Sequence, residues 1–242
     1  EQDYLDALEA DLEQALPQIW GRQIVSVFIG GGTPSLLSGE AMDRMLGLFR
    51  AYLNLWPETE ITLEANPGTA EAARFKEFAS AGVNRLSIGI QSFNDDALKA
   101  LGRIHDSAQA RRAIDMAQQA FDNINLDIMF ALPEQTLAQC RRDLESALSY
   151  QTRHLSLYHL TLEPNTVFAK YPPKVPDDDL GAEMQDMIAE LAEQGGWERY
   201  EVSAYARDGY RAVHNVNYWE YGDYLGIGPG ADRKSTRLNS SH

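Results

Sequence analysis

The chain has 242 residues, of which 21 are Lys or Arg and 36 are Asp or Glu, so its formal net charge at pH 7 is −15. Its hydrophobic content of 44% is that of a folded globular protein and excludes a disordered or fibrous chain. The strong negative charge repels a phosphate backbone, so no nucleic-acid partner is expected. No stretch approaches the roughly 20 apolar residues that span a bilayer, so no transmembrane segment is expected.

The chain contains a single cysteine, Cys140. One cysteine excludes a disulfide framework and fits the reducing conditions of the cytoplasm, so we expect a cytoplasmic protein. It also excludes a metal centre that takes several thiolates from these residues. Cys140 falls within a helical run beside Arg141 and Arg142, and we expect it to have a structural role.

The two ends of the sequence indicate a fragment. Helical periodicity starts at once, because Leu5, Leu8, Leu12 and Leu16 recur near one face of a helix. Residues 232–242 (DRKSTRLNSSH) are polar and basic, and they can be encoded by DNA that resembles a sequencing-library adapter. We therefore expect truncation at both ends and a non-native tail, which we exclude from the fold. A natural disordered tail is the alternative.

Short apolar segments alternate with amphipathic ones along the middle of the chain. The expected strands are residues 25–29, 61–64, 85–90, 125–129 and 154–158. The expected helices between them are residues 41–53, 69–81, 108–120 and 136–148. Consecutive βαβ units predict a parallel sheet, which is either an open doubly wound sheet or a closed or partial barrel.

Polar residues at the strand ends favour the barrel. Thr33, Glu64, Gln91 and Asp127 lie in the C-terminal half of successive strands or just beyond them. In a barrel these ends meet at one rim, where ligands bind. The alternative is that each of the four is a turn or cap residue.

The sequence changes character after Pro164. Residues 171–176 contain three prolines and predict an extended connector. A run of three aspartates then precedes a helix expected at residues 180–194, and an aromatic-rich segment follows. We therefore divide the chain into a barrel (residues 1–170) and a connector with the start of a smaller C-terminal module (residues 171–231).

Three glycines at residues 30–32 follow the first expected strand. Without a Cβ they let a ligand approach the backbone, although the run matches neither a Walker loop nor a dinucleotide fingerprint. Glu64 has the chemistry to accept hydrogen bonds from ribose hydroxyls or an amino group, and Arg103 has that of a carboxylate clamp. A helix cap and a solvated surface arginine are the plainer alternatives.

His214 opens a compact aromatic segment, HNVNYW at residues 214–219. A histidine can ligate haem iron, and neighbouring aromatic rings can stack on a flat macrocycle. The alternative is a histidine that packs against aromatic rings without any ligand.

Five motifs together resemble those of one protein family. They are GGGTPS (residues 30–35), TLEANPG (62–68), NRLSIGIQSFN (84–94), LGRIH (101–105) and HLTLEPNT (159–166). In combination, over residues 1–231, they resemble radical S-adenosylmethionine proteins related to oxygen-independent coproporphyrinogen III oxidase. The resemblance implies an α/β fold, a partial parallel βα barrel of radical SAM type without its first strand, followed by a truncated smaller C-terminal module.

The resemblance also implies cofactors. S-adenosylmethionine is expected at Gly31, Gly32, Thr33, Glu64, Gln91, Arg103 and Asp127. Haem is expected at His214, Asn215, Tyr218 and Trp219, which match an HNxxYW signature of the haem chaperones in this group. The family holds a [4Fe–4S] cluster by a CxxxCxxC motif, which is expected upstream of Glu1 in the intact parent, so no metal ligand is expected in this chain.

The function implied by the resemblance is that of a haem chaperone, which binds haem and passes it to acceptor proteins. The alternative is oxygen-independent coproporphyrinogen III oxidase, which decarboxylates its substrate by radical chemistry. The HNVNYW motif favours the chaperone. No catalytic residue is assigned, and the missing first strand predicts an exposed sheet edge beside residues 25–29.

Overall fold

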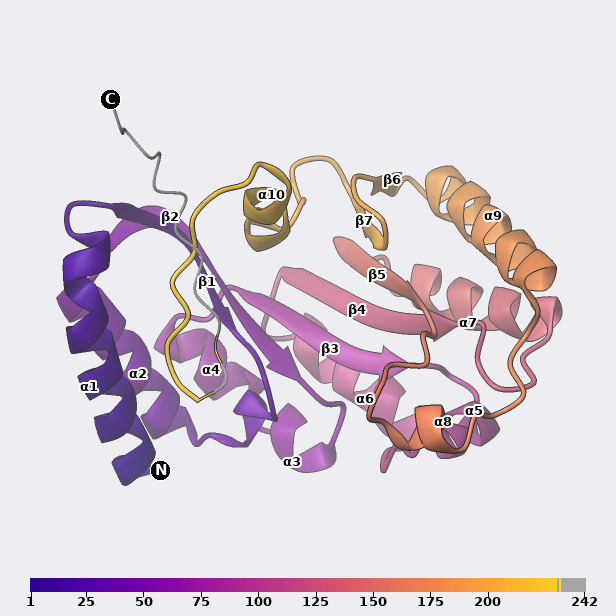
Figure 1. The fold of residues 1–242 in the computed structure, drawn as a ribbon, viewed down its shortest axis with the longest axis horizontal. Helices are drawn as coiled ribbons and strands as arrows, with labels where there is room; N and C mark the ends of the chain where they lie inside the picture. Colours follow the sequence, from indigo (N-terminus) through magenta and orange to yellow (C-terminus); the bar gives the residue numbers. More distant parts are fainter. Residues whose placement is uncertain (230, 232–242) are drawn as a thin grey trace.

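In the computed structural model, the chain forms a curved sheet with helices along its outer side (Figure 1). The structure describes residues 1–229 and residue 231, so the tail expected at residues 232–242 lies outside the described part. In that described part, hydrogen bonds join seven strands in the order β1-β2-β3-β4-β5-β7-β6. Among the helices described, none combines the length and the apolar composition that crossing a bilayer requires.

The first five strands run parallel, as the βαβ pattern predicts. They are β1 (Gln23–Ile29), β2 (Asn54–Ala65), β3 (Arg85–Gln91), β4 (Asn123–Phe130) and β5 (His154–His159). Together they curl into a half-barrel, which confirms the predicted partial parallel βα barrel. Within the described residues β1 pairs only with β2, so its other side is a sheet edge.

The chain after residue 170 adds two short antiparallel strands to the same sheet. β7 (Ala204–Ala206) pairs with β5, and β6 (Glu198–Arg199) pairs with β7. The sequence does not predict them, because strands of two or three residues are too short to show an alternating pattern. The division of the chain at residue 170 stays a prediction.

Most helices lie on the outer side of the sheet. The helices are α1 (Gln2–Ile19), η1 (Pro34–Leu36), α2 (Gly39–Tyr52), α3 (Thr69–Ala72), α4 (Phe75–Ala81), α5 (Asp95–Ala100), α6 (Ser107–Gln118), α7 (Leu137–Ser149), α8 (Val167–Lys170), α9 (Asp178–Gln194) and α10 (Val213–Trp219). α1, α2, α4, α6 and α7 follow the outer side, whereas α10 lies across the opposite, concave side (Figure 1).

The single helix predicted at residues 69–81 is wrong, because the structure divides it into α3 and α4. The division lies next to Arg74, whose guanidinium donates hydrogen bonds to the carbonyl oxygens of Leu36 (2.6 Å) and Leu37 (2.7 Å). This contact holds the loop after β1 against the start of α4. Helical periodicity does not reveal it, because the partners lie 38 and 37 residues away in the sequence.

Side chains of the sheet alternate between two different environments. The outer face packs against the helices, and its apolar residues include the buried Leu63, Leu86, Ile88, Leu126 and Leu155. Burying one such side chain contributes about 1.5–3 kcal/mol to folding, so this face holds the helices on the sheet.

The concave face is polar. Strand register places Thr62 beside Arg85, and Glu64 beside Ser87. The residues that share this face on β2 to β5 include Glu60, Thr62, Glu64, Arg85, Ser87, Asn125, Asp127, His154, Ser156 and Tyr158. Buried polar groups need hydrogen-bond partners, and many of these side chains bond to one another.

A chain of hydrogen bonds crosses the concave face. Asn125 donates from Nδ2 to Asp127 Oδ1 (2.8 Å), and its Oδ1 lies 2.6 Å from Nδ1 of His154. Nε2 of His154 lies 2.7 Å from the hydroxyl of Tyr200, in the turn between β6 and β7. Ser87 adds a second hydrogen bond to Asp127, at 2.9 Å. The chain therefore links the middle of the sheet to the segment that precedes α10.

The bonding pattern fixes the protonation of His154. The amide oxygen of Asn125 can only accept, so Nδ1 of His154 carries the proton and Nε2 accepts from Tyr200. Burial, with a smaller contribution from the positive charge of Arg85, lowers the pKa of His154 well below its usual value of 6.5. His154 is therefore a neutral imidazole at pH 7.

We predict that His154→Gln makes the protein less sensitive to mild acid. As the pH falls through 6.5, the unfolded wild-type chain takes up a proton at His154, whereas the folded chain does not. The free energy of unfolding therefore falls, by up to about 1.4 kcal/mol per pH unit from this residue. The measurement is urea denaturation of both proteins at about pH 7.5 and pH 5.5.

The difference in unfolding free energy between wild type and variant should shrink at the lower pH. His159→Gln, which makes the same substitution at the exposed end of β5, is the control. A difference that stays constant between the two pH values would contradict a neutral, buried His154.

Candidate functional site

The glycine loop after β1 lies against Glu64 of β2. The backbone N–H of Gly31 donates to Glu64 Oε2 over 3.2 Å. A Cβ at Gly30 would lie 2.7 Å from the same oxygen and 2.7 Å from the ring of Phe28, so this close approach requires glycine. At Gly31 and Gly32 a Cβ would meet no described atom within 4 Å, so the backbone there is open to a ligand.

Glu64 and Asp127 bring two carboxylates to the concave face. Burial raises the pKa of Glu64; the hydrogen bond from Gly31 opposes this effect, and the negative charge of Asp127 adds to it. Burial also raises the pKa of Asp127, against the hydrogen bonds that it accepts. A cationic ligand group that donates hydrogen bonds would stabilise both carboxylates in their charged form.

Arg103, between α5 and α6, brings a positive charge to the same end of the sheet. Burial of part of the side chain lowers the pKa of its guanidinium, and the charge of Asp127 opposes that effect. Arg103 is nevertheless exposed to solvent as a whole, so it can also reach the carboxylate of a ligand.

Gln91 and Thr33 lie at the ends of β3 and β1. Gln91 has a φ of 68°, in the left-handed region that residues other than glycine seldom occupy. The pairing of β3 with β4 shifts register just before it, and such bulges re-aim a side chain. Thr33 precedes the short helix η1. Both residues lie at the same end of the sheet as Glu64 and Asp127.

Tyr158 of β5 also belongs to this end of the sheet, although the sequence analysis does not identify it. Burial, followed by the negative charge of Asp127, raises the pKa of its phenol to about 12. The hydroxyl therefore stays protonated at neutral pH and can donate a hydrogen bond. The sequence signal for Tyr158 is its two-residue spacing from His154 and Ser156, which places all three on one face of the strand.

The HNVNYW segment forms α10 on the concave side of the sheet. Glu60 of β2 accepts hydrogen bonds from the backbone N–H groups of the first two helix residues, at 3.0 and 3.4 Å. The hydroxyl of Tyr200 accepts from the backbone N–H of Ala212 (3.2 Å) and from the side chain of Asn215 (3.1 Å). Polar contacts therefore attach this helix to the barrel.

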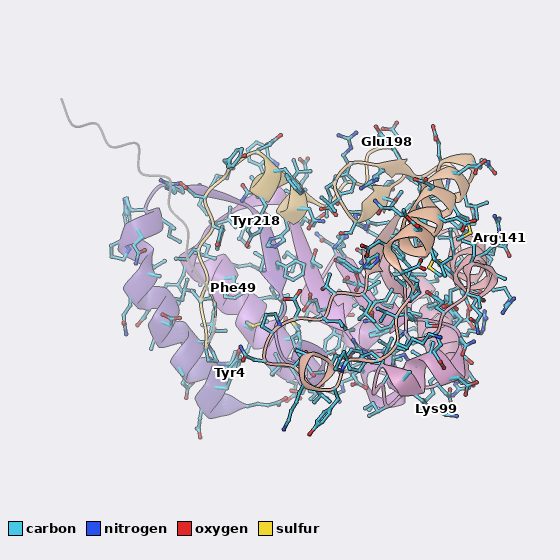
Figure 2. The ribbon with its side chains drawn as sticks, turned by 45° about the vertical axis from the view of Figure 1, so that its right-hand side comes forward. Tyr4, Phe49, Lys99, Arg141, Glu198 and Tyr218 are labelled. Atoms are coloured by element: carbon cyan, nitrogen blue, oxygen red, sulfur yellow. The ribbon has the colours of Figure 1, made fainter. Side chains whose placement is uncertain are left out.

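His214 of α10 is enclosed by aromatic rings. Its imidazole stacks on Phe28 of β1 with ring centroids 4.4 Å apart, and it meets the ring of Tyr218 at 5.0 Å. Tyr218 is labelled on α10 in Figure 2, and the next residue, Trp219, is 56% exposed. Burial, with the positive charge of Arg85, lowers the pKa of His214. The imidazole is therefore neutral at pH 7, which is the form that binds a metal.

The described residues do not fit an iron–sulfur cluster. Within residues 1–229 and residue 231, no group of three or more His, Cys, Asp or Glu side chains is placed to hold a metal ion. Cys140 packs in the hydrophobic core, and burial raises the pKa of its thiol to about 12. Its thiol therefore stays protonated at neutral pH.

Comparisons with known proteins place these features in a family. The model of the Radical SAM superfamily matches residues 3–147, which is more than half of the chain. The heme chaperone HemW of Haemophilus influenzae is 48% identical over 241 residues, which cover 98% of this chain and 63% of the relative. HemW of Escherichia coli is also 48% identical, over 235 residues that cover 97% of this chain and 62% of the relative. The chain thus spans less than two thirds of the length of these relatives.

The fold has a counterpart among solved structures. Coproporphyrinogen III oxidase (HemN) from Escherichia coli, a radical SAM enzyme, matches with a TM-score of 0.81 over 95% of this chain and 57% of that one. The sequence identity is 24%, so the likeness concerns the fold alone. Because the family model matches most of the half-barrel, this chain belongs to the radical SAM superfamily.

Proposed function

We propose that this protein is a haem chaperone, which binds haem on α10 and passes it to acceptor proteins. The observation that carries the proposal is the neutral imidazole of His214, enclosed by aromatic rings. The relatives at 48% identity bear the name heme chaperone, which supports it. We also infer a cytoplasmic location, because a single, reduced cysteine suits that compartment.

His214 has the properties of an axial haem ligand. A neutral imidazole offers a nitrogen lone pair to iron, and the lowered pKa keeps it neutral in mildly acidic solution. The stack on Phe28 covers one face of the ring and limits its rotation. Asn215, another predicted haem residue, instead bonds to Tyr200, so we assign it to holding the helix.

Tyr218 and Trp219 provide the surface on which a porphyrin can lie. They are 42% and 56% exposed, and a flat macrocycle stacks well on such rings. An open site suits a carrier, because haem held at the surface can be handed to another protein without the carrier unfolding. We therefore propose that acceptor proteins approach the side of the molecule that carries α10.

We further propose that the other end of the concave face holds S-adenosylmethionine. The proposed binding residues are Gly31, Gly32, Thr33, Glu64, Gln91, Arg103 and Asp127. They fit the cofactor, because the open glycine backbone admits it, the two carboxylates suit its sulfonium and amino groups, and the guanidinium suits its carboxylate. In this family the bound cofactor is a source of radicals, and we propose that in the intact parent a [4Fe–4S] cluster is held by cysteines that this chain does not contain.

The alternative function, oxygen-independent coproporphyrinogen III oxidase, lacks comparable support in the described part of the chain. The likeness to that enzyme is a likeness of fold at 24% identity. Beside the proposed S-adenosylmethionine site, the concave face carries the hydrogen-bond network that runs from Asp127 to Tyr200 and on to α10. The aromatic helix with its histidine therefore makes the chaperone the better proposal.

We predict that His214→Ala weakens haem binding at least about tenfold, which is the loss of about 1.4 kcal/mol of binding free energy expected when an axial ligand is removed. The measurement is titration of the protein with haem, followed at the Soret band. His159→Ala, which removes an exposed histidine from β5, should bind haem as the wild type does. A wild-type protein without a Soret shift would contradict the chaperone.

Haem binding should also resist mild acid. Protonation of His214 competes with iron, and its pKa lies below 6.5, so affinity should hold between about pH 7.5 and 6.5 and fall only in more acidic solution. The same titration at a series of pH values tests this. Loss of affinity that begins well above pH 6.5 would mean that the ligand is another group.

We predict that Glu64→Gln weakens the binding of S-adenosylmethionine about three- to tenfold, because a charged acceptor beside the glycine loop is lost. The measurement is isothermal titration calorimetry. Glu145→Gln, at an exposed site on α7, is the matched control and should bind as the wild type does. Equal affinities for Glu64→Gln and wild type would exclude this carboxylate from the site.

A further inference from the structure

Helix α10 does not hold itself in place. It has seven residues, and isolated helices shorter than about 12 residues are marginal in water. None of these seven residues, all of which the structure describes, is buried. The stack of His214 on Phe28 covers part of the helix, and polar contacts supply the rest of its attachment to the sheet.

Glu60 supplies the N-terminal cap that the helix lacks. The residue at the cap position is Ala212, whose side chain has no oxygen to accept a hydrogen bond. Oε1 of Glu60, from 153 residues earlier, accepts from the N–H of Val213 instead. Its Oε2 lies 4.0 Å from Nε of Arg85, which is 3% exposed. A buried carboxylate thus faces a positive charge on one side and the helix N-terminus on the other.

Tyr200 supplies the second attachment. Its hydroxyl proton must point to His154, because Nε2 of that neutral histidine carries no proton. Both lone pairs of the hydroxyl oxygen are then free for the N–H of Ala212 and the amide of Asn215, the two donors that reach it. The bond to His154 therefore orients Tyr200 to receive α10.

We propose that Tyr200 and Glu60 are positioning residues, which dock α10 on the sheet and thereby present the imidazole of His214 in one orientation. The docking of α10 by these two residues requires no ligand. Its effect on haem affinity rests on the proposed function. Neither residue touches the bound haem in this proposal, and both act through the helix that carries His214.

The first test measures docking without haem. Hydrogen–deuterium exchange of the full chain should show amides of residues 213–219 exchanging about three- to tenfold faster in Tyr200→Phe than in wild type, because about one hydrogen bond's worth of free energy is lost. Glu60→Gln should accelerate the same amides. Tyr210→Phe, which removes a hydroxyl from the neighbouring segment, is the control and should leave them unchanged. Unchanged exchange at 213–219 in both variants would overturn the proposal, as would acceleration spread evenly over the chain.

The second test measures the consequence for haem. Tyr200→Phe should raise the apparent dissociation constant for haem about three- to tenfold, because the competent docked state becomes less populated. If Tyr200 acts by docking α10, which also carries Tyr218 and Trp219, adding Tyr200→Phe to His214→Ala should cost clearly less than it costs in the wild type. An equal loss in both backgrounds would mean that Tyr200 supports the fold in general, and would overturn its positioning role.

The two tests separate the inference from the function on which it rests. If the wild type binds no haem, the chaperone is wrong, and the exchange rates alone decide whether Tyr200 and Glu60 dock the helix. If the wild type binds haem and neither variant changes binding or exchange, the chaperone stands and the positioning role is refuted.

Discussion

The hydrogen-bond chain from Asp127 through Asn125 and His154 to Tyr200 is the interaction on which the concave face depends. Every step has one direction, because each donor meets a group that can only accept. A buried polar group that loses its partner costs about 1–3 kcal/mol, so the chain is stable only when it is complete. Because the hydrogen-bond chain is complete, the concave face of the half-barrel can be polar, and His154 stays in one neutral form.

The charges on this face separate into two regions. Glu64 and Asp127 make the end near the glycine loop negative, and burial there raises the pKa of both. Arg85 brings a positive charge to the region under α10, where Glu60 faces it, and burial followed by this charge lowers the pKa of both His154 and His214. The proposed S-adenosylmethionine site and the proposed haem site therefore have different electrostatic surroundings on one sheet, with the neutral part of the network between them.

The sequence predicts the barrel well, because the period of its strands and helices is a local property. It also places Glu64 and Asp127 in the C-terminal half of their strands, and parallel strands share a direction. It does not predict that α10 is helical, because seven residues with none buried show no apolar stripe. Nor does it reveal Glu60 or Tyr200, whose partners in α10 are fixed by tertiary contacts across as many as 154 residues.

A bulge in β2 decides which side chains reach the concave face. Ile24 of β1 pairs with Leu55, but the next pair along joins Ser26 to Glu60. Over this stretch β1 advances by two residues and β2 by five, so β2 contains three extra residues. An odd number of extra residues exchanges the two faces of a strand, since side chains alternate with a period of two. Beyond the bulge, Glu60 therefore points to α10; without it, the apolar neighbour Ile61 would point there.

The side chain of Thr59 stabilises the bulge through two hydrogen bonds. Its hydroxyl lies 2.9 Å from the carbonyl oxygen of Ile24 and 2.7 Å from that of Trp56, so it spans the irregular stretch between the two strands. On the other strand, alternation puts Phe28 and Gly30 on the same face, two residues apart. Phe28 stacks on His214, and Gly30 leaves room for Glu64. The register of β1 against β2 therefore positions both proposed ligand sites together, and a change at this bulge would displace both.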